Sequence, residues 1–151
     1  MHPPPDDPPL RLRAARWVDI DPVTAYRLAA LRSAVFVVEQ QCPYLDLDGR
    51  DLEAATTQLW FEAAGGEVVA ALRVMAEAGG GWRIGRVVTD PAHRAVGLAG
   101  RLLEQAMAGR TGPFVLDAQS YLTEWYGRFG FVVDGPAFVE DGIPHTPMRR
   151  P

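Results

Sequence analysis

The 151-residue sequence contains a single cysteine, Cys42, and no long apolar run. One cysteine excludes an intramolecular disulfide, so a reducing cytoplasm is the simplest compartment. No stretch approaches the roughly 18 consecutive apolar residues that a membrane span requires, and the Pro-rich, acidic N-terminus does not resemble a signal peptide. We therefore expect a cytoplasmic protein with no membrane partner.

A surplus of basic residues is also missing. The formal net charge of −4 argues against nucleic acid as the main partner. No set of His, Cys and Glu residues has the spacing of a zinc site, so no metal is predicted. The length, with 48% apolar and 23% charged residues, is typical of one globular domain. We expect residues 1–9 to form a disordered tail and residues 10–150 a single domain.

The stretch from Thr89 to Gly109 organises the rest of the chain. A strand is predicted over residues 82–89, followed by a Pro-containing turn. A helix should begin near Gly97, because apolar residues then recur at helical spacing: Leu98, Leu102, Leu103, Ala106 and Met107. Gly109 is typical of the left-handed residue that closes a helix.

The first turn of that helix suggests an anion site. Its backbone N–H groups lack partners within the helix and carry the positive end of the helix dipole. The small residues Ala95, Gly97, Ala99 and Gly100 let an anion approach the backbone, and Arg94 adds a guanidinium. Together they predict a diphosphate cradle. The alternative is an ordinary strand–turn–helix. Two named phosphate-binding motifs are excluded, because the segment contains neither a P-loop nor a G-x-G-x-x-G pattern.

The remaining elements follow from local patterns. Asp21-Pro22 marks the start of a helix that should run to about Val37. Residues 39–56 predict a loop, with aspartates that either form turns or line an acceptor pocket. We also expect a strand over 10–18, a hairpin of 58–64 and 67–75, a strand over 113–119 parallel to 82–89, a helix over 121–129 capped by Ser120, and a hairpin of 131–139 and 144–148.

Three segments resemble a known family. Residues 94–99, Arg-Ala-Val-Gly-Leu-Ala, are similar to the R/Q-x-x-G-x-G/A signature of the GCN5-related N-acetyltransferases (GNAT), and residues 125–131 to their Y-x-x-x-G-F segment. A third set, residues 35–40, 42–44 and 46–49 with 140–145, looks like the ElaA-type branch. The resemblance covers roughly residues 10–150. It implies an α/β fold with a mixed, largely antiparallel sheet, a splayed parallel strand pair and helices on both faces.

The resemblance also implies an activity: transfer of an acetyl group from acetyl-CoA to a primary amine of a small molecule or peptide, by direct attack. Cofactor-binding positions carried over from the family are Val87, Val88, Thr89, Arg94, Ala95, Val96, Gly97, Leu98 and Ala99, with Gln119 placed to reach the thioester or the acceptor. Homodimers are common in the family. A non-catalytic acyl-CoA-binding or sensing module is the alternative, and neither the acceptor nor the acyl length follows from the sequence.

Three residues are candidates for proton transfer. Tyr126 stands where the family has the acid that protonates the leaving thiolate; a core tyrosine is the alternative. Glu39 follows a helix beside an irregular loop and is the candidate base, the alternative being a solvated helix-end glutamate. His145 has a side chain whose usual pKa suits proton transfer at neutral pH, although a single histidine on a strand is often structural.

Overall fold

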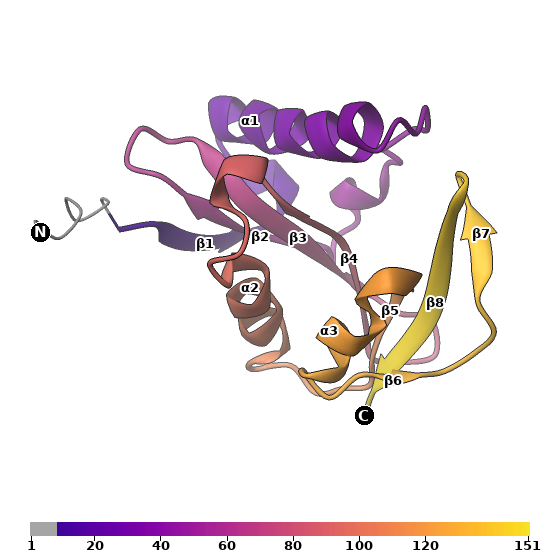
Figure 1. Cartoon of the computed structure of the whole chain (residues 1–151). Coiled ribbons are helices and arrows are strands. Elements are labelled where there is room, and N and C mark those ends of the chain that lie inside the picture. Colours follow the sequence, from indigo (N-terminus) through magenta and orange to yellow (C-terminus); the bar gives the residue numbers. More distant parts are fainter. Residues whose placement is uncertain (1–8) are drawn as a thin grey trace, which may run out of the picture.

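The computed structural model describes residues 9–151 and shows one continuous sheet with helices on both faces (Figure 1). The strand order is β1-β2-β3-β4-β5-β8-β6, with β7 paired to β8. Among residues 9–151 only β4 and β5 are parallel, so the expected mixed, largely antiparallel sheet is confirmed. The strands are β1 (Arg11–Ala15), β2 (Thr57–Glu62), β3 (Val68–Ala76), β4 (Trp82–Thr89), β5 (Phe114–Gln119), β6 (Val132–Val133), β7 (Phe138–Glu140) and β8 (Ile143–Arg150).

Helices divide the core into two layers. Helix α1 (Pro22–Arg32) packs on one face through a cluster that includes Leu28, Leu31 and Trp60. On the other face, α2 (Leu98–Met107) and α3 (Thr123–Gly127) bury a larger cluster. Eight consecutive residues of β3 are buried because this strand lies between the two layers. Among residues 9–151, no helix combines the length and the apolar character that crossing a membrane requires.

The parallel strands β4 and β5 separate soon after they meet. Their register includes only two pairs, Trp82 with Phe114 and Arg83 with Val115. Figure 1 shows β7 and β8 lying well apart from β4. From Ile84 onward, the edge of β4 that faces β5 is therefore free of ladder hydrogen bonds from that strand. The splayed parallel pair that the resemblance implied is present.

The first helix changes its hydrogen-bond pattern before it ends. Beyond Arg32 the chain continues as a π-helix from Ser33 to Glu39, with bonds such as Gln40 N–H to the Val35 carbonyl at 3.1 Å. The prediction of one α-helix to about Val37 was therefore wrong, because the α-helical hydrogen bonding ends at Arg32. A wider turn changes the direction in which later side chains point, and such turns are frequent at functional sites. Glu39 is the last residue of this π-helix.

Several predicted boundaries also move. The first strand ends at Ala15 and not near residue 18, because a 3-10 turn occupies Trp17–Asp19. Ser120 does not cap a helix: its hydroxyl bonds that of Thr146 at 2.8 Å, and a 3-10 turn precedes α3. The strand predicted over 131–139 is interrupted and forms the separate β6 and β7. The tail predicted over residues 1–9 lies, apart from its last residue, outside the described residues.

Candidate active site

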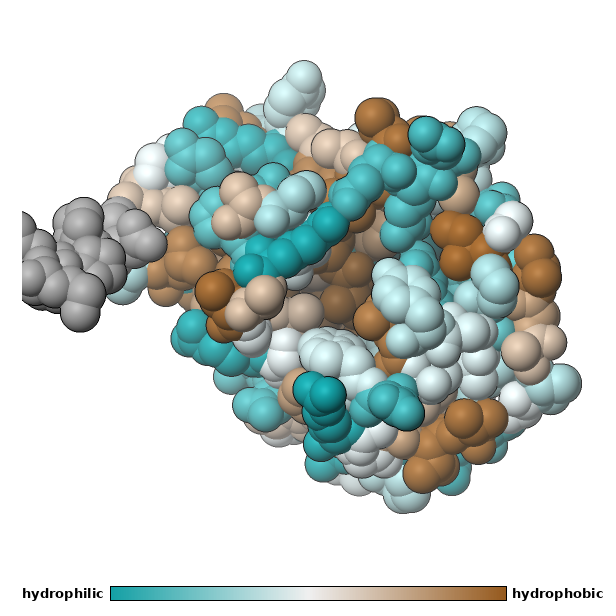
Figure 2. Space-filling model, in the orientation of Figure 1, coloured by the Kyte–Doolittle hydropathy of each residue, from teal (hydrophilic) through white to brown (hydrophobic). Residues whose placement is uncertain are grey.

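A cleft of about 1150 Å³ opens where β4 and β5 diverge. Figure 2 shows this face of the molecule, with apolar surface sunk in the middle and hydrophilic side chains crossing above it. The lining comes from elements far apart in the sequence: the end of the π-helix, the loop after it, β4 from Ile84 to Thr89, the start of α2, the end of β5, α3 and the β7–β8 hairpin. The cleft therefore brings most of the sequence-predicted site residues together.

The predicted cradle lies at one end of this cleft. Gly97, the residue before α2, adopts a left-handed conformation (φ +81°) and provides no side-chain cap. The first N–H groups of α2 thus keep their donor capacity, and Ala95, Gly97, Leu98 and Ala99 line the cleft. The unpaired edge of β4 runs toward them through Val87, Val88 and Thr89. These residues fit a ligand with a diphosphate and an extended chain that can pair with a strand edge; Val96 is exposed and is not part of the lining.

Gly100 is small for a different reason from the one the sequence suggested. A Cβ at this position would lie 2.8 Å from the Cζ atom of Phe129. Gly100 therefore allows α2 to approach the segment after α3, and its small size serves packing. A Cβ on Gly97 would meet nothing within 4 Å, so at that position only the positive φ favours glycine.

We expect Gly97→Asp to weaken acetyl-CoA binding at least tenfold, about 1.4 kcal/mol, measured by calorimetry. The carboxylate would project into the open space beside the helix N-terminus and repel a diphosphate. Gly97→Asn is the matched control, because it has the same shape and the same backbone strain of roughly 1 kcal/mol without the charge. Equal affinities of the two variants would remove the helix N-terminus from the binding site.

Tyr126 lies in the wall of the cleft with its ring buried against Trp125 and Phe131. Burial, with a smaller contribution from Tyr121, raises the pKa of its phenol above the ordinary value. The hydroxyl makes no hydrogen bond to another side chain or to the backbone among residues 9–151, so its proton is available to a group in the cleft. A phenol in this position remains protonated at neutral pH, as a proton donor must.

Glu39 forms a two-point ion pair with Arg94. The Arg94 Nη1 and Nη2 atoms each lie 2.7 Å from a carboxylate oxygen of Glu39, and the Arg94 Nε donates to the Thr89 carbonyl at 3.1 Å. Both side chains are about two-fifths exposed. The hydrogen bonds from Arg94 lower the pKa of Glu39, while nearby Asp90 acts in the opposite direction. Glu39, the candidate base, is thus held by Arg94, the residue expected to bind the diphosphate. The two residues are 55 positions apart, so no local sequence pattern could have indicated this pair.

His145 lies across the cleft on β8, opposite Gln119 in the register. Its Nδ1 is 2.7 Å from the Ile143 carbonyl, and its ring stacks on Phe138. Because a carbonyl only accepts, Nδ1 donates this hydrogen bond, and in the neutral ring Nε2 is then the acceptor. Gln119 bonds Gln40 at 3.3 Å, so the end of β5 is joined to the end of the π-helix.

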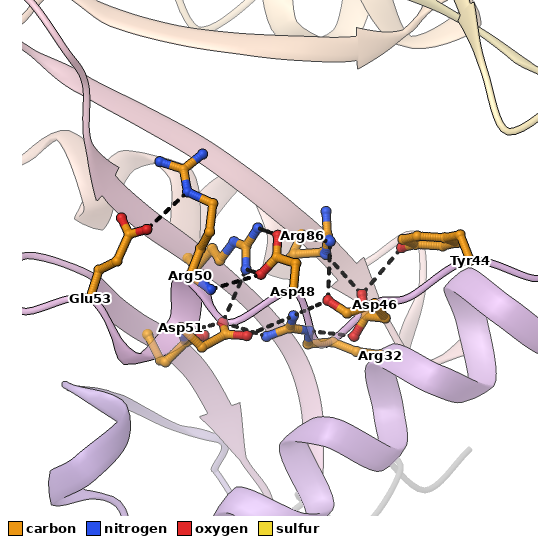
Figure 3. Close-up of polar contacts among 10 residues, drawn as sticks. Arg32, Tyr44, Asp46, Asp48, Arg50, Asp51, Glu53 and Arg86 are labelled. Atoms are coloured by element: carbon orange, nitrogen blue, oxygen red, sulfur yellow. Dashed lines mark hydrogen bonds and ion pairs between the residues drawn. The ribbon is translucent and has the colours of Figure 1, made fainter.

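The loop after the π-helix is held by buried ion pairs that the sequence analysis missed (Figure 3). Arg32, which is 1% exposed, bonds Asp46 through Nε at 2.9 Å and Asp51 through both Nη atoms. Burial raises the pKa of Asp51, but the hydrogen bonds and charge of Arg32 outweigh it, and the net shift is downward. Gln58 also donates to Asp51 at 2.8 Å. These contacts fix the loop against the sheet.

Two strand arginines extend this arrangement to the cleft. Arg73 of β3 makes a two-point pair with Asp48, at 2.9 and 2.7 Å. Arg86 occupies a bulge of β4 with φ +52°, and its Nε lies 2.8 Å from Asp46. We call the six residues the acid–arginine cluster: Arg32, Asp46, Asp48, Asp51, Arg73 and Arg86. Three positive charges face three negative ones, so the predicted loop aspartates do not present free carboxylates to an acceptor.

Cys42 lies between the loop and the β7–β8 hairpin. The thiol is buried, with its Sγ near the Gln40 and Asp141 carbonyls at 3.4 and 3.3 Å, so it joins the loop to the β7–β8 hairpin. Within the described part of the chain, no three His, Cys, Asp or Glu side chains are grouped to hold a metal ion.

A sheet opened between two parallel strands, with a helix N-terminus at one end of the gap, is the arrangement of the GNAT acyltransferase fold. Consistent with this, residues 32–150 match the family model described as an acetyltransferase (GNAT) domain, and the chain belongs to that family, in its ElaA-like branch.

Relatives and solved structures agree with this assignment. A UPF0039 protein of Mycobacterium tuberculosis is 51% identical over 145 residues, which cover 93% of this chain and 92% of that protein. Escherichia coli ElaA is 37% identical over 134 residues, covering 83% and 86% of the two chains. The crystal structure of an acyl-CoA N-acyltransferase from Pseudomonas aeruginosa superposes with a TM-score of 0.87 at 38% identity, covering 94% of this chain and all of that one.

Proposed function

We propose that this protein transfers an acetyl group from acetyl-CoA to a primary amine of a small molecule or peptide. The observation that carries the proposal is the cleft itself, which joins the open helix N-terminus of the predicted diphosphate cradle to Tyr126, a buried residue whose hydroxyl has no hydrogen-bond partner in the described chain. Acetyl-CoA would supply the activated acyl group. The residues that would hold it are Arg94, Ala95, Gly97, Leu98 and Ala99 at the diphosphate and the free edge of β4 along the extended chain.

The chain's own residues then account for two proton movements. Tyr126 keeps its proton at neutral pH and would donate it to the leaving thiolate. An alkyl ammonium has a pKa near 10.4 in water, so a base must accept its proton before the amine attacks. We assign this to Glu39, with the Nε2 atom of His145 as the second candidate, because both side chains line the cleft.

The acceptor enters, in this proposal, from the side of the cleft formed by the loop and the β7–β8 hairpin. Burial raises the pKa of Tyr44 in this wall to about 12, so its ring stays neutral. We keep the cytoplasm as the proposed location, since the one cysteine is a free thiol. Nothing in the cleft suggests nucleic acid as an acceptor, and a homodimer remains a proposal from the family alone.

The decisive experiment is a thiol-release assay with acetyl-CoA and a broad panel of amines. Release of free CoA that depends on one class of amine, with mass-spectrometric detection of the acetylated product, is the expected result. Tight CoA binding without release across the whole panel would instead support a non-catalytic acyl-CoA-binding module.

We expect Glu39→Gln to lower the turnover number roughly 100-fold at neutral pH, measured at saturating acetyl-CoA. The variant keeps the shape of the side chain and removes the base. Turnover should recover partly at high pH, where more of the amine is deprotonated in solution. Turnover equal to wild type would transfer the role to His145, and His145→Gln should then show the loss.

A further inference from the structure

Arg94 lies between two negatively charged partners, the Glu39 carboxylate and the predicted site of a diphosphate. Its position before α2 puts its guanidinium at the predicted diphosphate cradle, while its two Nη atoms are both directed at Glu39. The third donor atom, Nε, is occupied by the Thr89 carbonyl. An arginine binds a carboxylate or a phosphate most strongly when both Nη groups face it as a fork. The fork of Arg94 cannot face Glu39 and a diphosphate at once.

The ion pair also lies where an exchange of partners costs little. Both side chains are about two-fifths exposed, and exposed ion pairs contribute little stability. A diphosphate beside the N-terminus of α2 gains the helix dipole and the open N–H groups in addition to Arg94. Glu39, at the end of the π-helix, has none of these groups. The stronger ligand for Arg94 is thus the diphosphate.

We propose that diphosphate binding and release of Glu39 are coupled: a bound diphosphate takes Arg94 from Glu39, and the freed carboxylate can then accept a proton from the amine. The inference rests on the proposed function for its catalytic meaning, but the exchange of partners is a binding property. It makes Glu39 a competitor of the cofactor before it is a base. Cofactor loading would in this way prepare the acceptor side of the cleft.

The test is a calorimetric double-mutant cycle on the full chain at low ionic strength. Glu39→Gln should tighten CoA binding roughly two- to tenfold, because the competing carboxylate is gone. Arg94→Ala should weaken CoA binding. In the Arg94→Ala background, Glu39→Gln should change CoA affinity no more than the control substitution Glu140→Gln does. Pantetheine, which lacks the diphosphate, should bind the wild type and Glu39→Gln equally.

Glu140→Gln is the matched control, since Glu140 lines the same cleft and forms no ion pair within residues 9–151. Equal tightening by Glu140→Gln and Glu39→Gln would reduce the effect to general electrostatics and overturn the proposal. So would unchanged or weaker CoA binding by Glu39→Gln, since a weaker complex would mean that Glu39 positions Arg94 for the phosphate.

Inorganic pyrophosphate separates this inference from the proposed function. Tighter pyrophosphate binding by Glu39→Gln, in a protein that acetylates no amine, would retain the exchange of partners and reject the acetyltransferase. Amine acetylation by the wild type, with Glu39→Gln leaving pyrophosphate and CoA affinity unchanged, would support the acetyltransferase and reject the exchange of partners.

Discussion

Tyr126→Phe should lower the turnover number by roughly 10- to 1,000-fold, with little change in acetyl-CoA affinity or melting temperature. The substitution removes one oxygen and keeps the ring that packs edge-on against Trp125 and Phe131. Because the hydroxyl has no hydrogen-bond partner among the described residues, its loss should leave no buried group unsatisfied. Steady-state kinetics, calorimetry and thermal unfolding of both proteins provide the three measurements.

Tyr121→Phe is the matched control, because Tyr121 also lines the cleft but is largely exposed. It should retain near-normal turnover. A second comparison uses two acetyl thioesters whose leaving thiols differ in pKa: the loss in Tyr126→Phe should be smaller for the more acidic thiol, which needs less help from an acid. A loss of equal size for both thioesters would show that Tyr126 positions the cofactor and donates no proton.

Arg32→Met should reduce the free energy of unfolding by about 3–5 kcal/mol. Methionine keeps the apolar part of the side chain but leaves the carboxylates of Asp46 and Asp51 buried without their main partner. Urea unfolding gives the change. Arg27→Met on the same helix is the control and should cost little, since the one side-chain hydrogen bond of Arg27 within residues 9–151 is an exposed contact with the Gly65 carbonyl. Similar losses for both variants would refute a special role for the buried ion pairs.

The same ion pairs set an acid limit on stability. The folded-state pKa of Asp51 is lowered, so the unfolded chain binds more protons as the pH falls below the ordinary aspartate value near 3.9. The stabilisation from this residue is therefore complete above that value and declines below it. In Arg32→Met the contribution of Asp51 to the free energy of unfolding should be smaller. The difference in free energy of unfolding between variant and wild type should therefore narrow as the pH is lowered.

Local patterns in the sequence were sufficient for the organising unit. The strand predicted over residues 82–89 matches β4, and the helix predicted from near Gly97 matches α2, because apolar spacing and a left-handed glycine act over a few residues. The splayed parallel pair and the sheet type followed from the resemblance and are confirmed. Whether the cradle binds a diphosphate stays a prediction.

Contacts between distant segments could not be predicted in this way. Arg32 belongs to a predicted helix, where an arginine ordinarily marks the exposed face, yet it is buried because the loop supplies Asp46 and Asp51. The sequence predicted one helix to about Val37 and gave no sign of the change to a π-helix over Ser33–Glu39. Gly100 was assigned to anion approach, but its neighbour Phe129 becomes visible only in three dimensions.

The acid–arginine cluster also constrains how this protein can evolve. Surface loops usually accept insertions and substitutions independently of the strands beneath them. Here the loop supplies three carboxylates, while Arg73 and Arg86 come from neighbouring strands and Arg32 from the first helix. The chain contains no lysine. A loop of different sequence would therefore have to place its carboxylates opposite the same three arginines. We therefore expect the loop, the helix and the strands to change together. Under the proposed function, a new acceptor preference should arise more readily through the β7–β8 hairpin than through the loop.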